Sequence, residues 1–132
     1  MSAANLAVVR QFYDHVFAGE LEKLAPLLAD SFNVVEADGL PYAGVFEGYD
    51  GLMTLMAKVQ RHWGTQFSGE IEHYIASGDR VAVLLLMKGV DAKSGVPVAV
   101  PLCEVWEIQN GKVASVRPFD WDTAKVAALE LR

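Results

Sequence analysis

The segment EVWEIQNGKV, which runs from Glu104 to Val113, contains the clearest signal for local structure in the chain. Apolar and polar residues alternate up to the dipeptide Asn110-Gly111, and the alternation resumes after it. Such alternation predicts half-buried strands, and Asn-Gly between two of them predicts a tight antiparallel hairpin. We therefore expect adjacent strands over residues 96–109 and 112–119.

Acidic and aromatic residues are concentrated around this predicted hairpin: Glu104, Trp106, Asp120, Trp121 and Asp122. A carboxylate on the buried face of a strand is costly unless it has a hydrogen-bonding or charged partner, and such groups are often functional. The hairpin is therefore where we look first for a functional site, although Asp122 is placed to cap a following helix.

The composition limits the class of protein. With 132 residues, of which 52% are hydrophobic, the chain is expected to form one domain over residues 1–132. No apolar stretch approaches the roughly 20 residues of a membrane helix, and no secretory signal is visible, so we expect a cytoplasmic protein. A net charge of -6 disfavours binding to nucleic acid. One cysteine and three scattered histidines predict neither a disulfide nor a metal site.

The first half of the chain has helical periodicity. Apolar residues recur at helical spacing over three predicted helices, at residues 4–18, 21–30 and 50–64, with Asp50 as the expected N-cap of the third. A short strand is expected at residues 32–36, and the glycines and proline of residues 37–48 predict a loop.

From about residue 67 onward the pattern is that of strands. Strands are expected at residues 68–76 and 80–88 before the hairpin, and a last helix at residues 123–131. The strand at residues 80–88 is apolar on both faces, so we expect it to be covered on both sides. The order of elements predicts an α+β fold in which helices lie on one face of a curved antiparallel sheet.

Five short motifs, in this order and spacing, resemble the nuclear transport factor 2-like superfamily over nearly the whole chain. They are FAGEL (17–21), LADSF (28–32), FEGYDG (46–51), SGDRV (77–81) and NGKV (110–113). The similarity is to the polyketide-cyclase-like (SnoaL-like) and ketosteroid-isomerase-like branch. It implies a cone-shaped sheet wrapped around the helices, a largely apolar pocket and, in many members, dimers through the outer face of the sheet. Functions vary across the superfamily, so the fold does not settle the activity.

The resemblance to ketosteroid isomerases also implies site residues. Their proton-shuttle carboxylate falls on Glu36, and their first-helix tyrosine falls on Phe12, with Tyr13 adjacent. Their late-strand acid falls on Glu104, or on Cys103 after a slip of one residue. Half of the family's oxyanion hole is therefore missing, which argues against a true steroid isomerase.

Each candidate acid also has a plain structural alternative. If Trp106 points inward, the period of two puts Glu104 on the same inner face. Glu104 could instead form an ordinary ion pair across strands with Arg80, Lys88 or Arg117. Glu36 and Asp120 each end a strand, where acids also serve in turns. We take Glu36, Glu104 and Asp120 as candidate catalytic residues.

Aromatic residues are too numerous for a small cone to pack solidly, so several are expected to line the pocket. His73 shares the apolar side of its strand with Ile71 and Ile75, where a core or interface histidine is the alternative to a ligand-binding one. The predicted substrate-binding residues are Phe12, Tyr13, Phe17, Tyr42, Trp63, His73, Trp106, Phe119 and Trp121.

Two functions remain open. The first is an isomerase, cyclase or hydrolase that acts on a small apolar substrate without a cofactor, with Glu36 as general base and Glu104 or Asp120 as acid or orienting group. The second is a non-catalytic dimeric module that binds a ligand or a protein. Acids paired with Arg or Lys would favour the second, and unpaired acids the first. In both cases we expect a homodimer through the outer face of the sheet.

Overall fold

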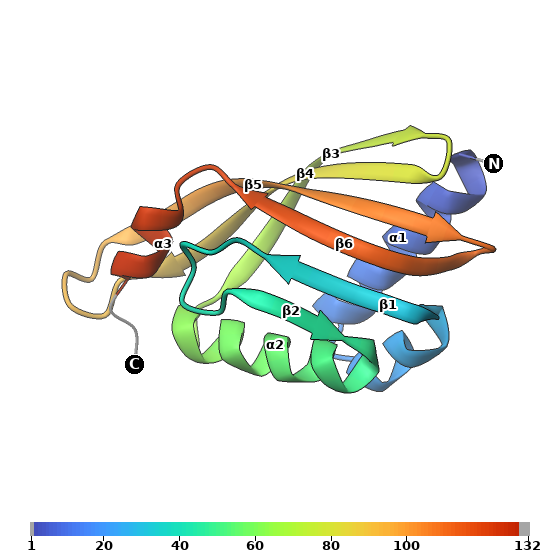
Figure 1. Cartoon of the computed structure of the whole chain (residues 1–132). Helices are drawn as coiled ribbons and strands as arrows, with labels where there is room; N and C mark the ends of the chain where they lie inside the picture. The colour runs from blue at the N-terminus through green and yellow to red at the C-terminus, as the bar shows by residue number, and fades with distance from the viewer. Residues whose placement is uncertain (1, 130–132) are drawn as a thin grey trace.

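Six strands form one curved, unclosed sheet in the computed structural model, which describes residues 2–129 (Figure 1). Their spatial order is β2-β1-β6-β5-β4-β3. The strands are β1 (Leu28–Glu36), β2 (Gly44–Glu47), β3 (Ser68–Ser77), β4 (Arg80–Val90), β5 (Pro97–Gln109) and β6 (Lys112–Asp120). The expected α+β class, with a curved sheet packed against helices, is confirmed.

Two long helices lie on the inner side of this sheet. Helix α1 (Ser2–Phe17) packs against β3, β4 and β6, and helix α2 (Gly48–Trp63) packs against β1 and β2 (Figure 1). In α1 the buried residues Val9, Phe12 and Tyr13 recur at helical spacing, which explains why this face turns toward the sheet. The core therefore lies between the helices and the inner face.

The predicted hairpin is present. Gln109 faces Lys112 across the turn, and Asn110 and Gly111 have φ angles of 51° and 76°. Two successive positive φ angles are the conformation that Asn-Gly favours in a two-residue turn. The hairpin sets the register of β5 against β6 next to the turn, and a bulge between Glu107 and Ile108 then shifts it by one residue, which places Val116 opposite Trp106.

The early elements differ from the sequence prediction in three ways. The second helix is a short 3-10 helix (Leu21–Leu27) with Pro26 inside it, and β1 then begins at Leu28. Strand β2 lies in the expected loop, where its largely exposed residues gave no alternating pattern. Helix α2 has Glu47 rather than Asp50 as its N-cap.

The sheet is mixed rather than wholly antiparallel, because β1 pairs in parallel with β6, as Val34 opposite Val116 shows. Strand β4 is only half-buried on its outer face, so residues 2–129 do not provide the predicted cover on both sides. Helix α3 (Thr123–Ala128) is capped by Asp122, as predicted, through a bond of 2.9 Å from the backbone N–H of Lys125. The end of the predicted last helix, residues 130–131, lies outside the described residues.

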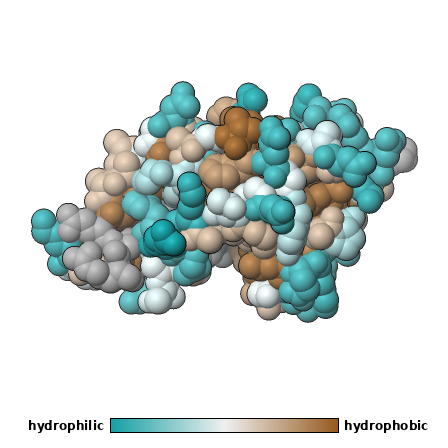
Figure 2. All heavy atoms as spheres, turned by 60° about the horizontal axis from the view of Figure 1, so that its bottom comes forward, coloured by the Kyte–Doolittle hydropathy of each residue, from teal (hydrophilic) through white to brown (hydrophobic). Residues whose placement is uncertain are grey.

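The outer surface over the helices is mixed in character. Figure 2 shows the α2 side of the molecule, where hydrophobic patches are separated by hydrophilic atoms. Between residues 2 and 129, no helix has the length and hydrophobicity needed to span a membrane.

Gly51 tests the close approach of α2 to β2. In most helices replacing glycine by alanine adds about 1 kcal/mol of stability. Here an added Cβ would lie 2.9 Å from the backbone carbonyl carbon of Phe46, which cannot rotate away. We therefore expect Gly51→Ala to lower the free energy of unfolding by about 1 to 3 kcal/mol, as overpacking does, measured by urea denaturation.

Thr54→Ala is the matched control, because Thr54 is exposed on the same helix. It should leave stability unchanged or slightly higher. A gain of stability in Gly51→Ala would contradict the close packing.

Candidate functional site

Three carboxyl groups converge on the inner face of the sheet. Glu104 in β5 lies opposite the buried Val83, which confirms the inward parity predicted for it. Asp120 at the end of β6 lies opposite the buried Leu102 on the same face. Glu36 ends β1 and is only 7% exposed. The hairpin, the bulge in the β5–β6 pairing and the parallel β1–β6 pair thus bring the three predicted catalytic acids together.

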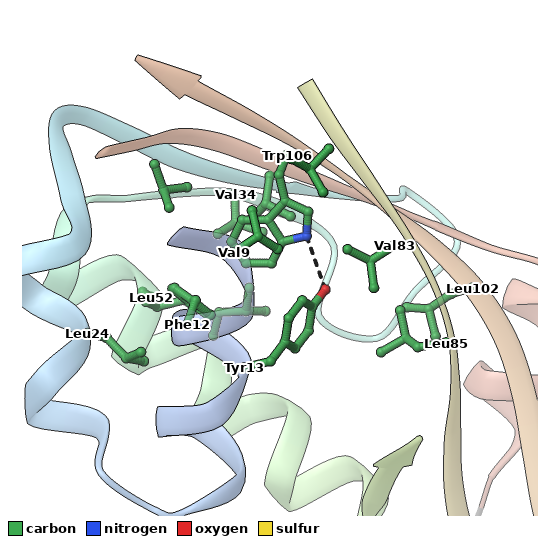
Figure 3. Packing of buried hydrophobic residues seen from close by; sticks show 14 of the residues in the cluster. Val9, Phe12, Tyr13, Leu24, Val34, Leu52, Val83, Leu85, Leu102 and Trp106 are labelled. Carbon is green, nitrogen blue, oxygen red and sulfur yellow. Dashed lines mark hydrogen bonds between the residues drawn. The ribbon is translucent and has the colours of Figure 1, made fainter. Parts of the chain in front are cut away.

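Glu104 is bound by a tyrosine rather than by a cation. The hydroxyl of Tyr13 donates a hydrogen bond to its carboxylate. The indole N–H of Trp106 donates to the Tyr13 oxygen at 3.0 Å (Figure 3). Burial, and then the charge of Glu104, raise the pKa of Tyr13 well above its ordinary value. A hydrogen-bonded relay therefore joins the first helix to the centre of the sheet.

The ion-pair alternative for Glu104 does not describe the structure. Arg80 binds Glu107 at 3.1 Å, and Lys88 binds Glu70 at 2.9 Å, both on the outer side of the sheet. Arg117 is exposed and lies opposite Val105, also on the outer face. All three cations named as possible partners therefore lie on the other side of the sheet from Glu104.

A second tryptophan–tyrosine pair lies near the acids. The indole N–H of Trp63 donates to the hydroxyl oxygen of the buried Tyr42 at 3.1 Å. Burial raises the pKa of Tyr42, and the negative charges of Asp120, Glu36 and Glu104 raise it further. Within residues 2–129 no acceptor takes the proton of Tyr42, so this hydroxyl is available as a donor to a ligand.

Burial shifts the titration of all three carboxyl groups. It raises the pKa of Glu36 to about 8, with Glu104 and Asp120 adding repulsion. It raises the pKa of Glu104 to about 7, although the bond from Tyr13 acts in the opposite direction. It raises the pKa of Asp120 to about 6, although the residue's own backbone N–H lowers it in part. The three acids therefore titrate at different points near neutral pH.

Asp120 has the least satisfied carboxylate. Both of its oxygens are fully buried, and no donor between residues 2 and 129 makes a hydrogen bond to either. The nearby backbone N–H of Asp120 itself does not reach hydrogen-bonding geometry. Buried polar atoms without partners are rare in proteins, and they are expected where a ligand completes the site.

Five of the predicted aromatic residues are close to these acids. Phe12 and Tyr13 pack edge-to-face on Trp106, with ring centroids 4.8 Å and 5.4 Å away. Tyr42 and Trp63 form the second pair described above. The ring of Phe17 lies beside that of Tyr13, with centroids 6.0 Å apart, but Phe17 is more than half exposed. It therefore lies at the edge of this group.

Three predicted substrate-binding residues lie elsewhere. Phe119 is opposite Cys103 on the outer face, and Trp121 is 84% exposed beyond the end of β6. His73 is exposed and faces Leu84, because a bulge at residue 72 shifts the register after Ile71 and turns His73 outward. The expectation that His73 shares a face with Ile71 is therefore wrong.

Two residues of this region were not predicted from the sequence. Tyr74 packs against Tyr13 with their ring centroids 6.2 Å apart, and the guanidinium of Arg10 lies over the ring of Tyr74. His62 is half-buried, contacts the ring of Tyr42 and makes a hydrogen bond of 2.6 Å to the carbonyl oxygen of Val126. The bulge at residue 72 interrupts the alternation of β3, so the sequence pattern does not indicate that Tyr74 faces inward. No local sequence pattern indicates that His62 binds the carbonyl oxygen of Val126. Within the described chain no three His, Cys, Asp or Glu side chains are arranged to hold a metal ion.

Comparison with known proteins identifies relatives of this arrangement. The family model described as "SnoaL-like domain" matches residues 9–116. No curated protein sequence matches the chain.

Solved structures share the fold over almost the whole length. Bal32a, from a soil-derived mobile gene cassette, is 21% identical with a TM-score of 0.85, and the match covers 97% of each chain. An NTF2-like protein of unknown function from Burkholderia pseudomallei is 24% identical with a TM-score of 0.80, over 98% of each chain. TerC, co-crystallised with polyporic acid, is 19% identical with a TM-score of 0.83, over 96% of this chain and 97% of that one. At these identities the likeness establishes the fold alone.

The buried acids predict an inverted dependence of stability on pH. A carboxyl whose pKa is raised by folding binds its proton more tightly in the folded state, so stability falls as pH rises. For Glu36, with its pKa raised to about 8, we expect the free energy of unfolding to fall by about 3 kcal/mol between about pH 5 and about pH 8.

Glu36→Gln should flatten this profile and raise stability at pH 8, measured by urea denaturation across the pH range. Glu72→Gln is the control, because Glu72 is exposed on β3 and loses the same charge. Stability that rises with pH in the wild type would contradict the burial of Glu36 as an unpaired acid.

Proposed function

Because the chain belongs to the SnoaL-like domain family, we propose that it binds a small, largely apolar molecule at the inner face of the sheet and transfers protons to and from it without a cofactor. One observation carries this proposal. Three buried carboxyl groups converge beside aromatic side chains, and no cation in the described chain neutralises them. Unpaired acids of this kind favour acid/base catalysis over a purely structural role.

The order of the pKa values and the unpartnered oxygens of Asp120 support the following roles. Asp120, with the lowest value of the three, is ionised at neutral pH and has two unpartnered oxygens, so it acts as the general base. Glu36, with its pKa raised to about 8, keeps its proton and acts as the general acid. This proposal differs from the sequence-based expectation, in which Glu36 is the base, because burial favours the protonated form of Glu36.

Proton transfer next to a carbonyl is the simplest reaction that this pair supports. Asp120 takes a proton from the carbon beside the carbonyl group, and Glu36 gives a proton to the carbonyl oxygen, which yields the enol. The reverse steps return a solvent proton to the carbon. The free hydroxyl of Tyr42 adds a donor for the same oxygen.

The bicyclic ketone 2-tetralone tests this proposal. We expect the enzyme to exchange its α-protons for deuterium in D2O, followed by proton NMR. The rate should follow a bell-shaped curve, falling below about pH 6 as Asp120 is protonated and above about pH 8 as Glu36 loses its proton. Asp120→Asn and Glu36→Gln should each slow the exchange by about 100-fold or more.

Glu72→Gln serves again as the control and should exchange at the wild-type rate. Exchange no faster than in buffer would refute catalysis of this reaction. If 2-tetralone still bound, the non-catalytic binding module would be the better description.

The outer face of the sheet supports a second proposal, that two copies of the chain associate. A row of side chains crosses four strands on this face, as His73, Leu84, Cys103 and Phe119 lie opposite one another in turn. Phe119 on β6 and Ile75 on β3, two residues along from His73, are more than half exposed. Exposed apolar area of this kind marks interfaces, and a two-fold pairing of the same surface is the commonest solution.

Sedimentation velocity measures this directly. We expect a dimer at micromolar concentration, and Leu84→Lys should weaken association by about 100-fold or more, because it buries an unpaired ammonium in the interface. Thr54→Lys, on the exposed side of α2, should remain dimeric. A monomeric wild type would end the proposal.

A further inference from the structure

Glu104 differs from the other two acids in having a fixed donor. An indole nitrogen can only donate, so the Tyr13 oxygen must accept from Trp106, and the proton of Tyr13 is directed at Glu104. This orientation makes Glu104 an acceptor and favours its ionised form. Asp120 and Glu36 have no comparable donor within residues 2–129.

The charge held by Glu104 lacks a counter-charge. The ion pairs of Glu70 and Glu107 lie on the outer face, and no described cation lowers the pKa of Glu104. The other two acids on the inner face add further acceptors. Both carboxylate oxygens of Asp120 are buried without a hydrogen-bond donor in the described chain. The side chain of Glu36 is 7% exposed, and no hydrogen bond contributes to its pKa. Ionising a buried carboxyl group that has only a neutral donor is costly, and a positive charge on a bound ligand would remove that cost.

We propose that the ligand of this site carries a protonated amine and that Glu104 binds its ammonium group. The inference rests on the proposed function, because it places the ligand against the same inner face. An ammonium group has three N–H donors and no acceptor, which matches a site rich in acceptors.

Neutral ligands match the site less well. A hydroxyl group donates one hydrogen bond and leaves the charge of Glu104 uncompensated, and a bare carbonyl group donates none. Charge-assisted hydrogen bonds are the stronger kind. The net charge of -6 also attracts cations over longer distances, so the control variant must separate this general effect from Glu104 itself.

Two compounds with the same bicyclic body as 2-tetralone provide the test. 2-Aminotetralin carries an ammonium group at neutral pH, and 2-hydroxytetralin carries a hydroxyl at the same carbon. Isothermal titration calorimetry at pH 8 should show 2-aminotetralin binding tenfold or more tightly, as a bond to a charged group gives. Equal affinities, or tighter binding of the alcohol, would overturn the inference and leave the proposed function standing. Failure of both compounds and of 2-tetralone to bind would overturn the proposed function as well.

A proton-release measurement adds a second readout. At pH 6, Glu104 is largely protonated, because its pKa is raised to about 7, so binding an ammonium must displace its proton. Titrations in two buffers of different ionisation enthalpy should detect proton release with 2-aminotetralin and none with 2-hydroxytetralin. Absence of release with the amine would contradict binding to Glu104.

Glu104→Gln identifies the residue. Glutamine keeps the shape and can still accept the bond from Tyr13, so binding of 2-hydroxytetralin should be unchanged while the preference for the amine and the proton release disappear. Glu72→Gln removes the same charge from an exposed position and should keep both. A preference that survives in Glu104→Gln, or is lost in Glu72→Gln, would refute the role of Glu104.

Discussion

The hydrogen bonds that run from Trp106 through Tyr13 to Glu104 hold the site together. They connect the middle of β5 to α1, so the helix cannot shift along the sheet without leaving a buried carboxylate unsatisfied. Because the indole can only donate, the relay has one direction, and that direction gives Glu104 a different chemistry from Asp120. The fold thus gives three carboxyl groups different properties by giving each of them different hydrogen-bond partners.

The second tryptophan–tyrosine pair shows the same principle with a different result. Trp63 donates to Tyr42 as Trp106 donates to Tyr13, but the proton of Tyr42 has no acceptor in the described chain. The hydroxyl of Tyr13 therefore donates its hydrogen bond within the protein, to Glu104. The hydroxyl of Tyr42, which lies near the acids, can donate to a ligand instead. The proposed division of labour among Glu36, Glu104 and Asp120 depends on this difference.

Sequence patterns predicted the features that depend on local spacing. The period of two and the Asn110-Gly111 turn placed Glu104 on the inner face, and the family resemblance placed Glu36 beside it. The errors came from long-range effects. A bulge turned His73 outward, and strand pairing placed Phe119 opposite Cys103 on the outer face. The proposed acid and base roles differ from those expected from the sequence because they rest on burial, which a sequence does not report residue by residue.

The parallel pair between β1 and β6 determines when the site can form during folding. Strands β3 to β6 follow one another as antiparallel neighbours, and their contacts are local in the sequence. Strand β1 joins them only by bringing Val34 against Val116 from the other end of the chain, which requires closure of a long loop. We therefore expect Glu36 to reach Glu104 and Asp120 late in folding. On that order the early sheet forms without the repulsion among the three acids, and the cost of bringing them together arises when β1 docks.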